Sequence, residues 1–281
     1  MKYNRLCLSA LSLLSVVSFA YAGAMGPASS APIHKTGFFI GIGESYNSVR
    51  NNTTTTGTLN AVSGFPPLDV FSGTTKSSSR THSSFAPEAQ AGYFQHFTDS
   101  NWLWGIEFLY QYSHIKTKTY GPANALNLVA PNINTEDEIN FGLVQTRVKN
   151  QFVLPAFIGR SFTNSFVYLG TGPAVLDARR QVSSVSDNLS AFYMGTERGF
   201  SRSKWVWGGA VQAGFAYYLN PSWFLKLNYT YTVTGRYETS KTISFSPAAN
   251  GGLNSGTASF STSQRLTAQE AAISINKVFS L

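Results

Sequence analysis

Hydrophobic and polar residues alternate with a period of two along several segments of the chain. In residues 102–113, large apolar side chains occupy every second position: Trp102, Trp104, Ile106, Phe108, Tyr110 and Tyr112. The intervening positions carry Leu103, Gly105, Glu107, Leu109, Gln111 and Ser113. Successive side chains of a β-strand point to opposite faces, so this pattern predicts a strand with one apolar face and one smaller or more polar face.

Seven further strands are predicted. Residues 202–219, 223–234 and 143–158 alternate clearly, whereas 37–47, 84–97, 164–177 and 264–281 do so more weakly. In residues 143–158 the alternation puts Arg147 and Lys149 on the polar face. Strict alternation also puts Glu44 and Glu270 on the apolar face, where we expect a β-bulge or a position at the rim.

The connections between these strands alternate in length. Residues 98–101, 159–163 and 220–222 are short and rich in turn formers, whereas 48–83, 114–141, 178–201 and 237–263 are long and rich in Ser, Thr, Asn and Gly. Outer-membrane barrels combine short periplasmic turns with longer external loops. The pattern therefore predicts an all-β fold: a closed, antiparallel, up-and-down transmembrane β-barrel of eight strands. Ten strands stay possible, because residues 48–83 are long enough for an extra hairpin.

The N-terminal residues do not alternate; they have the pattern of an export signal. Lys2 and Arg5 precede an apolar stretch at residues 6–19, and Ala20-Tyr21-Ala22 has the small-x-small form of a cleavage site. We expect residues 1–22 to be a signal peptide for the general secretory pathway, 23–36 a periplasmic tail and 37–281 the barrel. Cleavage would remove Cys7, the only cysteine, and with it any disulfide or cysteine chemistry.

The remaining charge is basic and unevenly placed. Of the 21 Lys and Arg residues, 19 lie beyond the leader, against 13 acidic residues, and 15 of the 19 fall in the predicted outer half or its loops. Phosphates of lipopolysaccharide would attract such a rim. An equally good explanation is that lipid-facing positions simply exclude charge. The candidate rim residues are Lys116, Lys118, Arg179, Arg180, Arg202, Arg236, Lys241 and Arg265.

Other charges are predicted to face the lumen. An eight-stranded barrel is just wide enough for its own side chains to fill it, so these charges should pair with one another across the interior. We interpret them as a structural plug, with a narrow ion path as the functional alternative. The candidates are Glu88, Glu107, Arg147, Lys149, Lys204 and Lys226.

Catalytic and metal sites have weaker support. His82 and His114 stand beside Ser83 and Ser113, but sequential strand residues point to opposite faces and cannot pair as base and nucleophile. His34 falls in the tail, and His96 is expected to pack in the lumen. The acidic run 136–138 lacks the spacing of a calcium loop. We therefore expect no catalytic residues, no cofactor and no metal, with a lipid A-modifying enzyme as a lesser alternative.

Outward aromatic residues are expected to form belts at the two membrane interfaces. The final strand places Ile273, Ile275, Phe279 and Leu281 on one face, and we interpret Phe279 and Leu281 as a signal for the barrel-assembly machinery. The belt candidates are Trp102, Trp104, Tyr110, Tyr112, Trp205, Trp207, Tyr217, Trp223, Tyr229 and Tyr231.

Four glycine–aromatic segments carry a family resemblance: 37–43, Gly92-Tyr93, 168–172 and Gly214-Phe215. On these residues the chain resembles the small outer-membrane β-barrels that include the opacity proteins and the transmembrane domain of OmpA-like proteins. The resemblance implies a protein of the bacterial outer membrane and hands over no catalytic residues; we expect a non-enzymatic monomer. It also implies external roles such as adhesion, through a host or matrix protein, or envelope integrity. A small diffusion porin is the main alternative, and nucleic acid is not expected as a partner.

Overall fold

A computed structural model describes residues 36–62, 69–79, 83–119, 125–130, 135–141, 144–187, 196–246 and 255–280. The leader, most of the proposed tail, His34, His82 and Leu281 lie outside these residues. The described residues form one 13-stranded antiparallel sheet. Its strands are β1 (Gly37–Val62), β2 (Asp69–Ser79), β3 (Ser83–His96), β4 (Trp102–Thr119), β5 (Ala125–Ala130), β6 (Thr135–Phe141), β7 (Val144–Val153), β8 (Ala156–Ser161), β9 (Ser165–Asp187), β10 (Thr196–Asn220), β11 (Trp223–Thr234), β12 (Tyr237–Phe245) and β13 (Ser255–Ser280).

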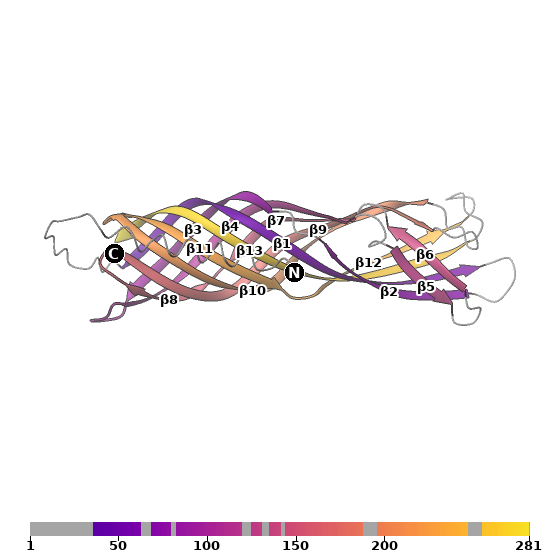
Figure 1. The fold of residues 1–281 in the computed structure, drawn as a ribbon, viewed down its shortest axis with the longest axis horizontal. Coiled ribbons are helices and arrows are strands. Elements are labelled where there is room, and N and C mark those ends of the chain that lie inside the picture. The colour runs from indigo at the N-terminus through magenta and orange to yellow at the C-terminus, as the bar shows by residue number, and fades with distance from the viewer. Residues whose placement is uncertain are drawn as a thin grey trace, which may run out of the picture. The chain divides into compact units, whose positions relative to one another are not determined.

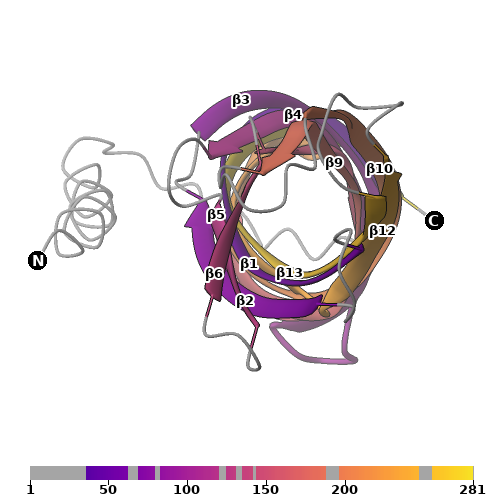
Figure 2. The ribbon, with the colours of Figure 1, turned by 90° about the vertical axis from the view of Figure 1, so that its right-hand side faces the viewer.

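The sheet closes into a ring of eight positions, as the alternation predicts. Around the ring the order is β1, β3, β4, one position shared by β7 and β8, then β9, β10, β11 and β13. Strand β13 pairs back onto β1. The β1–β13 register runs without a shift from Gly37↔Ser280 to Val62↔Ser255. Figures 1 and 2 show this closed ring from the side and from one end. The three short turns lie between β3 and β4, β8 and β9, and β10 and β11, as predicted.

One position of the ring is shared by two strands. Residues 143–158 were predicted as a single strand, but β7 ends at Val153 and β8 begins at Ala156. Both strands lie between β4 and β9, and two hydrogen bonds span the interruption: Glu107 N donates to Pro155 O (2.9 Å) and Leu154 N donates to Pro173 O (3.0 Å). Because proline has no N–H, the break falls where a regular ladder would lose a donor.

The long connections are largely strands, which corrects the prediction of loops. Strands β1 and β13 each have 26 residues, β9 has 23 and β10 has 25, whereas a bilayer needs only about 10. Beyond the ring, β2 pairs with the outer part of β1, β5 and β6 continue the sheet to β9, and β12 pairs with β13. Figure 1 shows β2, β5, β6 and β12 at the opposite end from β8. We call this part the external extension.

Two apolar clusters fill the inside of the ring at different heights. The first lies near the short turns and is mainly aromatic; the second lies toward the external extension and is mainly aliphatic. The turn-side cluster contains Phe39, Phe94, Leu103, Phe157, Phe166, Tyr168, Ala216, Tyr218, Phe224 and Val278. The extension-side cluster contains Val49, Leu109, Ile115, Val148, Val153, Ala174, Leu176, Ala178, Val206, Ala210, Tyr237, Leu266 and Ala268.

Inward glycines make room for the turn-side rings. A side chain at Gly105 would meet the Phe157 ring, and one at Gly214 would meet the Tyr168 ring. Phe157 and Tyr168 are themselves in contact, with ring centroids 5.1 Å apart. Close packing in this cluster therefore depends on the absence of a Cβ at the position directly paired with each ring on the neighbouring strand.

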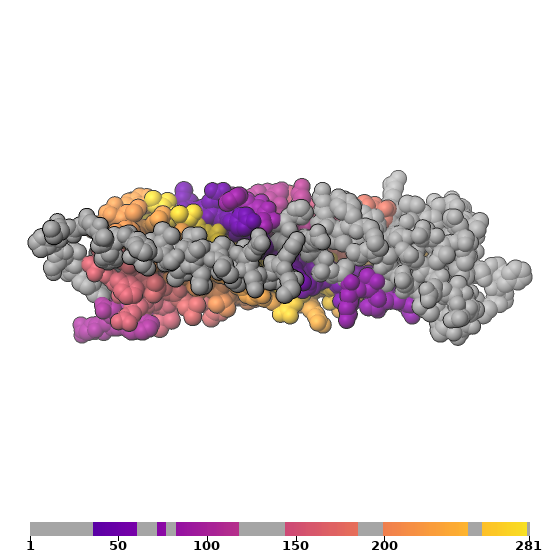
Figure 3. All heavy atoms as spheres, in the orientation of Figure 1, coloured from indigo at the N-terminus to yellow at the C-terminus, as the bar shows by residue number. Residues whose placement is uncertain are grey.

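The outer wall of the ring has the opposite character from a water-soluble protein. Ile42 is 70% exposed, Trp207 69% and Leu169 58%, and these residues lie on different strands around the ring. Figure 3 shows one face of this wall, where atoms of β1 and β13 lie next to each other. In the described part of the chain, no helix has the length and apolar character needed to cross a membrane.

Candidate functional site

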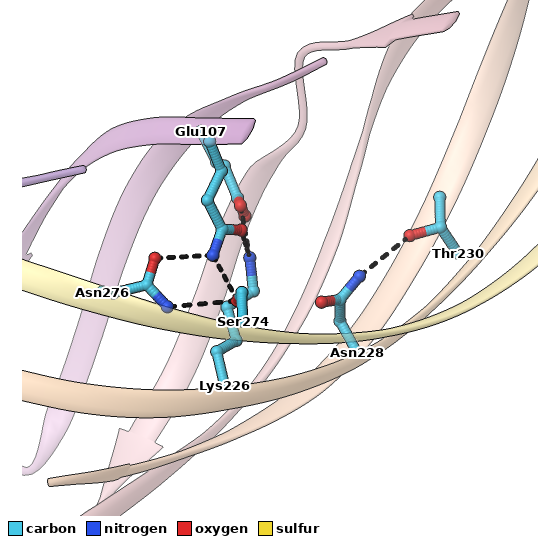
Figure 4. A network of polar contacts seen from close by, with 7 residues as sticks. Glu107, Lys226, Asn228, Thr230, Ser274 and Asn276 are labelled. Atoms are coloured by element: carbon cyan, nitrogen blue, oxygen red, sulfur yellow. Dashed lines mark hydrogen bonds and ion pairs between the residues drawn. The ribbon is translucent and has the colours of Figure 1, made fainter. Parts of the chain in front are cut away.

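A polar layer separates the two apolar clusters inside the ring. Lys226, which is 2% exposed, forms an ion pair with Glu107, which is 1% exposed. The lysine Nζ also donates to Gln90 Oε1 at 2.6 Å. Gln90 Nε2 donates to Asn276 Oδ1 at 2.5 Å and to Ser274 Oγ, and Asn276 Nδ2 donates to Ser274 Oγ at 3.1 Å. Figure 4 shows how β3, β4, β11 and β13 bring these groups together across the interior.

Three acids and one lysine make up the described charges of this layer. Glu88 and Glu270, like Glu107, are buried, and the Glu88 and Glu270 carboxyl groups lie close to each other. Gln151 Nε2 donates to Glu270 Oε2 at 3.4 Å. Lys226 acts electrostatically on both Glu88 and Glu270, so one ammonium group balances a cluster of carboxyl groups.

The predicted set of lumen charges is partly wrong. Glu88, Glu107 and Lys226 do face the lumen, but Lys149 is exposed and Arg147 is partly exposed on the outer face. Lys204 lies on the inner face, opposite Ala178, but it is exposed because the pairing of β10 with β11 reaches only to Gly208. The reason for Arg147 and Lys149 is an irregular register: β7 shifts against β9 between Val148 and Gln151, and β4 shifts against β7 between Tyr112 and Ile115. The shift puts Thr146 and Val148 inward before the bulge and Gln151 and Val153 inward after it.

Glu270 and Glu44 have different outcomes. Glu270 is 1% exposed and faces inward, in phase with Ala272 and Ser274 along an unbroken β13. The expectation that alternation puts Glu270 on the apolar face was therefore wrong, and no bulge is needed there. Glu44 is exposed on the outer face, two positions before Tyr46.

The ten belt candidates all lie on outward positions of the ring, and none is buried. Several meet other outward rings: Tyr93 contacts Trp104 (6.0 Å between centroids), and Phe152 contacts both Tyr110 (5.0 Å) and Trp205 (5.7 Å). The exposed members are Trp102, Trp104, Trp205, Trp207, Tyr217, Trp223, Tyr229 and Tyr231, and Tyr110 and Tyr112 are partly exposed.

Near the short turns, Lys277 Nζ lies 5.8 Å from the centroid of the Trp223 ring and 5.3 Å from that of Phe279. The methylene chain of such a lysine lies along the apolar wall, and its ammonium group lies near aromatic rings. This arrangement is typical of a lysine whose charged end reaches out of the hydrocarbon to the membrane interface. Phe279, half of the proposed assembly signal, is exposed on the outer wall.

Most of the basic rim candidates are exposed or partly exposed, but Arg180 is not. Lys116, Arg179, Arg202, Arg236 and Arg265 are exposed and Lys241 is partly exposed, whereas the side chain of Lys118 lies outside the described residues. Arg179 Nε donates to Ser201 Oγ at 2.8 Å. Arg180 does not belong to the rim: it faces inward and is 4% exposed.

The histidines give no catalytic set among the described residues. Ser113 faces inward and donates to Gln111 Oε1 at 2.9 Å, whereas the His114 ring contacts the outward Tyr112 ring. Partial desolvation, followed by the charges of Arg147, Lys116 and Lys149, lowers the pKa of His114. The three basic groups therefore make the electrostatic potential at the His114 ring positive.

Sequence reasoning missed one side-chain pair: His96 Nε2 and Ser161 Oγ lie 2.7 Å apart near the short turns. These residues are distant in sequence and come together because β3 and β8 flank β4. Among the described residues, no three His, Cys, Asp or Glu side chains are placed to hold a metal ion. The side chains of the acidic run 136–138 lie outside the described residues.

The ring, its filled interior and its apolar wall define a small up-and-down β-barrel. No protein-family profile and no curated protein matches the sequence. Ail, the attachment invasion locus protein of Yersinia pestis, solved with the heparin analogue sucrose octasulfate, is 11% identical over 84% of this chain and 99% of that chain, with a TM-score of 0.34. The outer membrane protein OprG of Pseudomonas aeruginosa is 13% identical over 88% and 98%, with a TM-score of 0.37. The outer membrane protease OmpT of Escherichia coli is 9% identical over 85% and 97%, with a TM-score of 0.36. At these identities and TM-scores, the tasks of those proteins do not carry over to this chain.

Proposed function

We propose that this chain is a non-enzymatic surface protein of the bacterial outer membrane, in which the ring is the membrane anchor and the external extension binds partners outside the cell. The observation that carries the proposal is a reversal of polarity along single strands. On β13, Ile273, Ile275 and Phe279 face outward. Nearer the external extension, the large apolar residues of the same strand, Leu266 and Phe260, are instead buried inside.

The same reversal occurs on β1. Phe38, Ile40 and Ile42 face outward, whereas Val49 and Leu59 are buried inside and Arg50 and other polar residues take the outer face. An apolar outer wall is unfavourable in water, because each exposed Å² of apolar surface costs about 25 cal/mol. It is favourable in hydrocarbon, so the reversal marks the level at which the chain leaves the bilayer for water.

The basic rim lies at or beyond this level and supports lipopolysaccharide as a partner. Lys116, Arg179 and Arg202 are exposed here, and they would meet the phosphates of the outer leaflet with charge-assisted hydrogen bonds. The further partners in this proposal are the barrel-assembly machinery during export and a host or matrix protein at the external extension.

The filled interior supports an anchor over a diffusion porin. Large side chains fill the ring on both sides of the charged layer. On the turn side these include Phe94 and Phe224, on the extension side Leu109 and Leu176, and each is at most 1% exposed. Opposite-face placement of Ser113 and His114 likewise disfavours a lipid A enzyme built on that pair.

Two measurements test the proposal. The folded protein should fractionate with outer membranes, and purified protein in a planar bilayer should give no stable channels of uniform size. Recovery of the folded protein as a water-soluble monomer would contradict the anchor, and uniform ion channels would contradict the plugged interior. Binding of cells or matrix protein should fall when β12 and the outer part of β13 are replaced by a short turn, while fractionation stays unchanged.

A further inference from the structure

Arg180 is an inward-facing cation without a described counter-ion. It lies on β9, three residues beyond Asp177. Asp177 pairs with Trp205, an outward residue of the apolar wall, so Arg180 lies past that wall, toward the external extension. Its side chain is 4% exposed, and Nε and Nη1 are buried without a hydrogen-bond partner. A buried guanidinium with free donors is unfavourable, because the charge has lost its water without gaining an acceptor.

A second unused donor lies in the same part of the interior. Gln264, on β13, is 1% exposed, and its Nε2 has no hydrogen-bond partner. Its Oε1 accepts a hydrogen bond from the Tyr237 hydroxyl, which fixes the amide orientation, and Tyr237 interacts electrostatically with Arg180. Arg180 on β9 and Gln264 on β13 thus present N–H groups toward one region, and Tyr237 on β12 links the two side chains.

The described surroundings supply no negative charge to this region. The buried acids are Glu88, Glu107 and Glu270, all in the polar layer, and the described group that acts on Arg180 is the Tyr237 phenol. Burial lowers the pKa of Arg180 to about 10, which leaves the guanidinium positively charged at neutral pH. The charge therefore has to be balanced by something other than a described side chain.

We propose that Arg180 and Gln264 bind a phosphate-type oxyanion inside the external end of the barrel. Guanidinium and amide N–H groups are suited to oxyanions, since each N–H can donate to a separate oxygen. Beside the site the sheet is not continuous: Arg180 pairs with Arg202 on β10, Tyr237 begins β12, and no backbone pairing joins β10 to β12 in the described residues. The anion is either free phosphate or the phosphate of an outer-leaflet lipid.

Ligand-dependent stability tests the site. Protein refolded in detergent free of lipopolysaccharide is unfolded with and without inorganic phosphate, against chloride at matched ionic strength. Phosphate at ten times its dissociation constant should lower the unfolding equilibrium constant about elevenfold. Arg180→Met should abolish this effect, and without phosphate it should be at least as stable as the parent. Arg50→Met, which removes an exposed outward arginine on β1, is the matched control and should keep the effect.

A second arm identifies the source of the phosphate and guards against a variant that fails to fold. Phosphorus NMR of the unmodified protein should detect binding of inorganic phosphate in detergent. If phosphate adds no further stability in bilayers that contain lipopolysaccharide, the lipid phosphate occupies the site; if it still does, the site takes the free ion. Equal phosphate effects in the Arg180 and Arg50 variants, or no binding to the unmodified protein, would overturn the proposal.

Discussion

Replacing Lys226 by Met should destabilise the barrel strongly, because it leaves Glu107 buried without its cation. Both side chains are at most 3% exposed, and the ammonium group also donates to Gln90. Removing one partner of a buried ion pair costs about 3–5 kcal/mol, whereas replacing both partners by neutral groups is often close to neutral. We therefore expect about 4 kcal/mol for Lys226→Met and about 1 kcal/mol or less for Lys226→Met combined with Glu107→Gln.

Urea unfolding of the refolded protein in lipid vesicles, followed by tryptophan fluorescence, measures these differences. At an m value of about 2 kcal/mol per M, the single variant should lose roughly 2 M in its midpoint and the double variant should recover most of it. Lys204→Met is the control, since Lys204 is exposed, and it should stay within about 0.5 kcal/mol of the parent. If Lys226→Met matched Lys204→Met, or the double variant were the least stable, the ion pair would not be what balances Glu107.

Two further predictions concern the packing and the outer wall. Gly105→Val should cost about 1–3 kcal/mol, because the new side chain meets the Phe157 ring. Gly209→Val should be nearly neutral by the same unfolding assay, because its Cβ would meet only the Gly172 carbonyl oxygen, at an ordinary contact distance of 3.9 Å. Leu227→Arg, at an exposed outward position midway along β11, should lower the free energy of unfolding in vesicles by about 2–4 kcal/mol. Thr242→Arg on the external β12 is the control and should change it very little. Equal losses in the two variants would contradict the position proposed for the membrane.

The ring was predictable because the bilayer imposes its pattern directly on the sequence. Trp102, Trp104 and Ile106 had to alternate with smaller residues, and short turns had to join antiparallel neighbours. The external extension was missed because its strands carry Ser and Thr in place of large apolar residues. One signal was present: residues 53–56 are four consecutive threonines, and β-branched Thr favours strands over loops.

Site residues were harder to predict, because one inserted residue inverts every side chain after it. The bulge between Val148 and Gln151 has no glycine or proline to announce it, so Arg147 and Lys149 were assigned to the wrong face. Arg180 was placed in a loop, where charge on either face is unremarkable. Once residues 178–187 are recognised as a continuation of β9, their alternation puts Ala178, Arg180 and Val182 on the inner face.

Strands in place of loops change how the external part would recognise a partner. In the outer sections of β1 and β2, residues 51–61 pair with 69–79 along a continuous ladder, and Thr56 and Thr74 hydroxyls lie 3.3 Å apart on its exposed face. A mobile loop loses conformational freedom when it binds, at about 0.5–1.5 kcal/mol for each side chain that becomes fixed, and its backbone must be ordered as well. A paired strand has already lost most of that freedom on folding. Recognition here would therefore depend on which side chains the register displays. A partner that binds this surface should be more sensitive to a one-residue shift in β2 than to the composition of residues 63–68, which join β2 to β1.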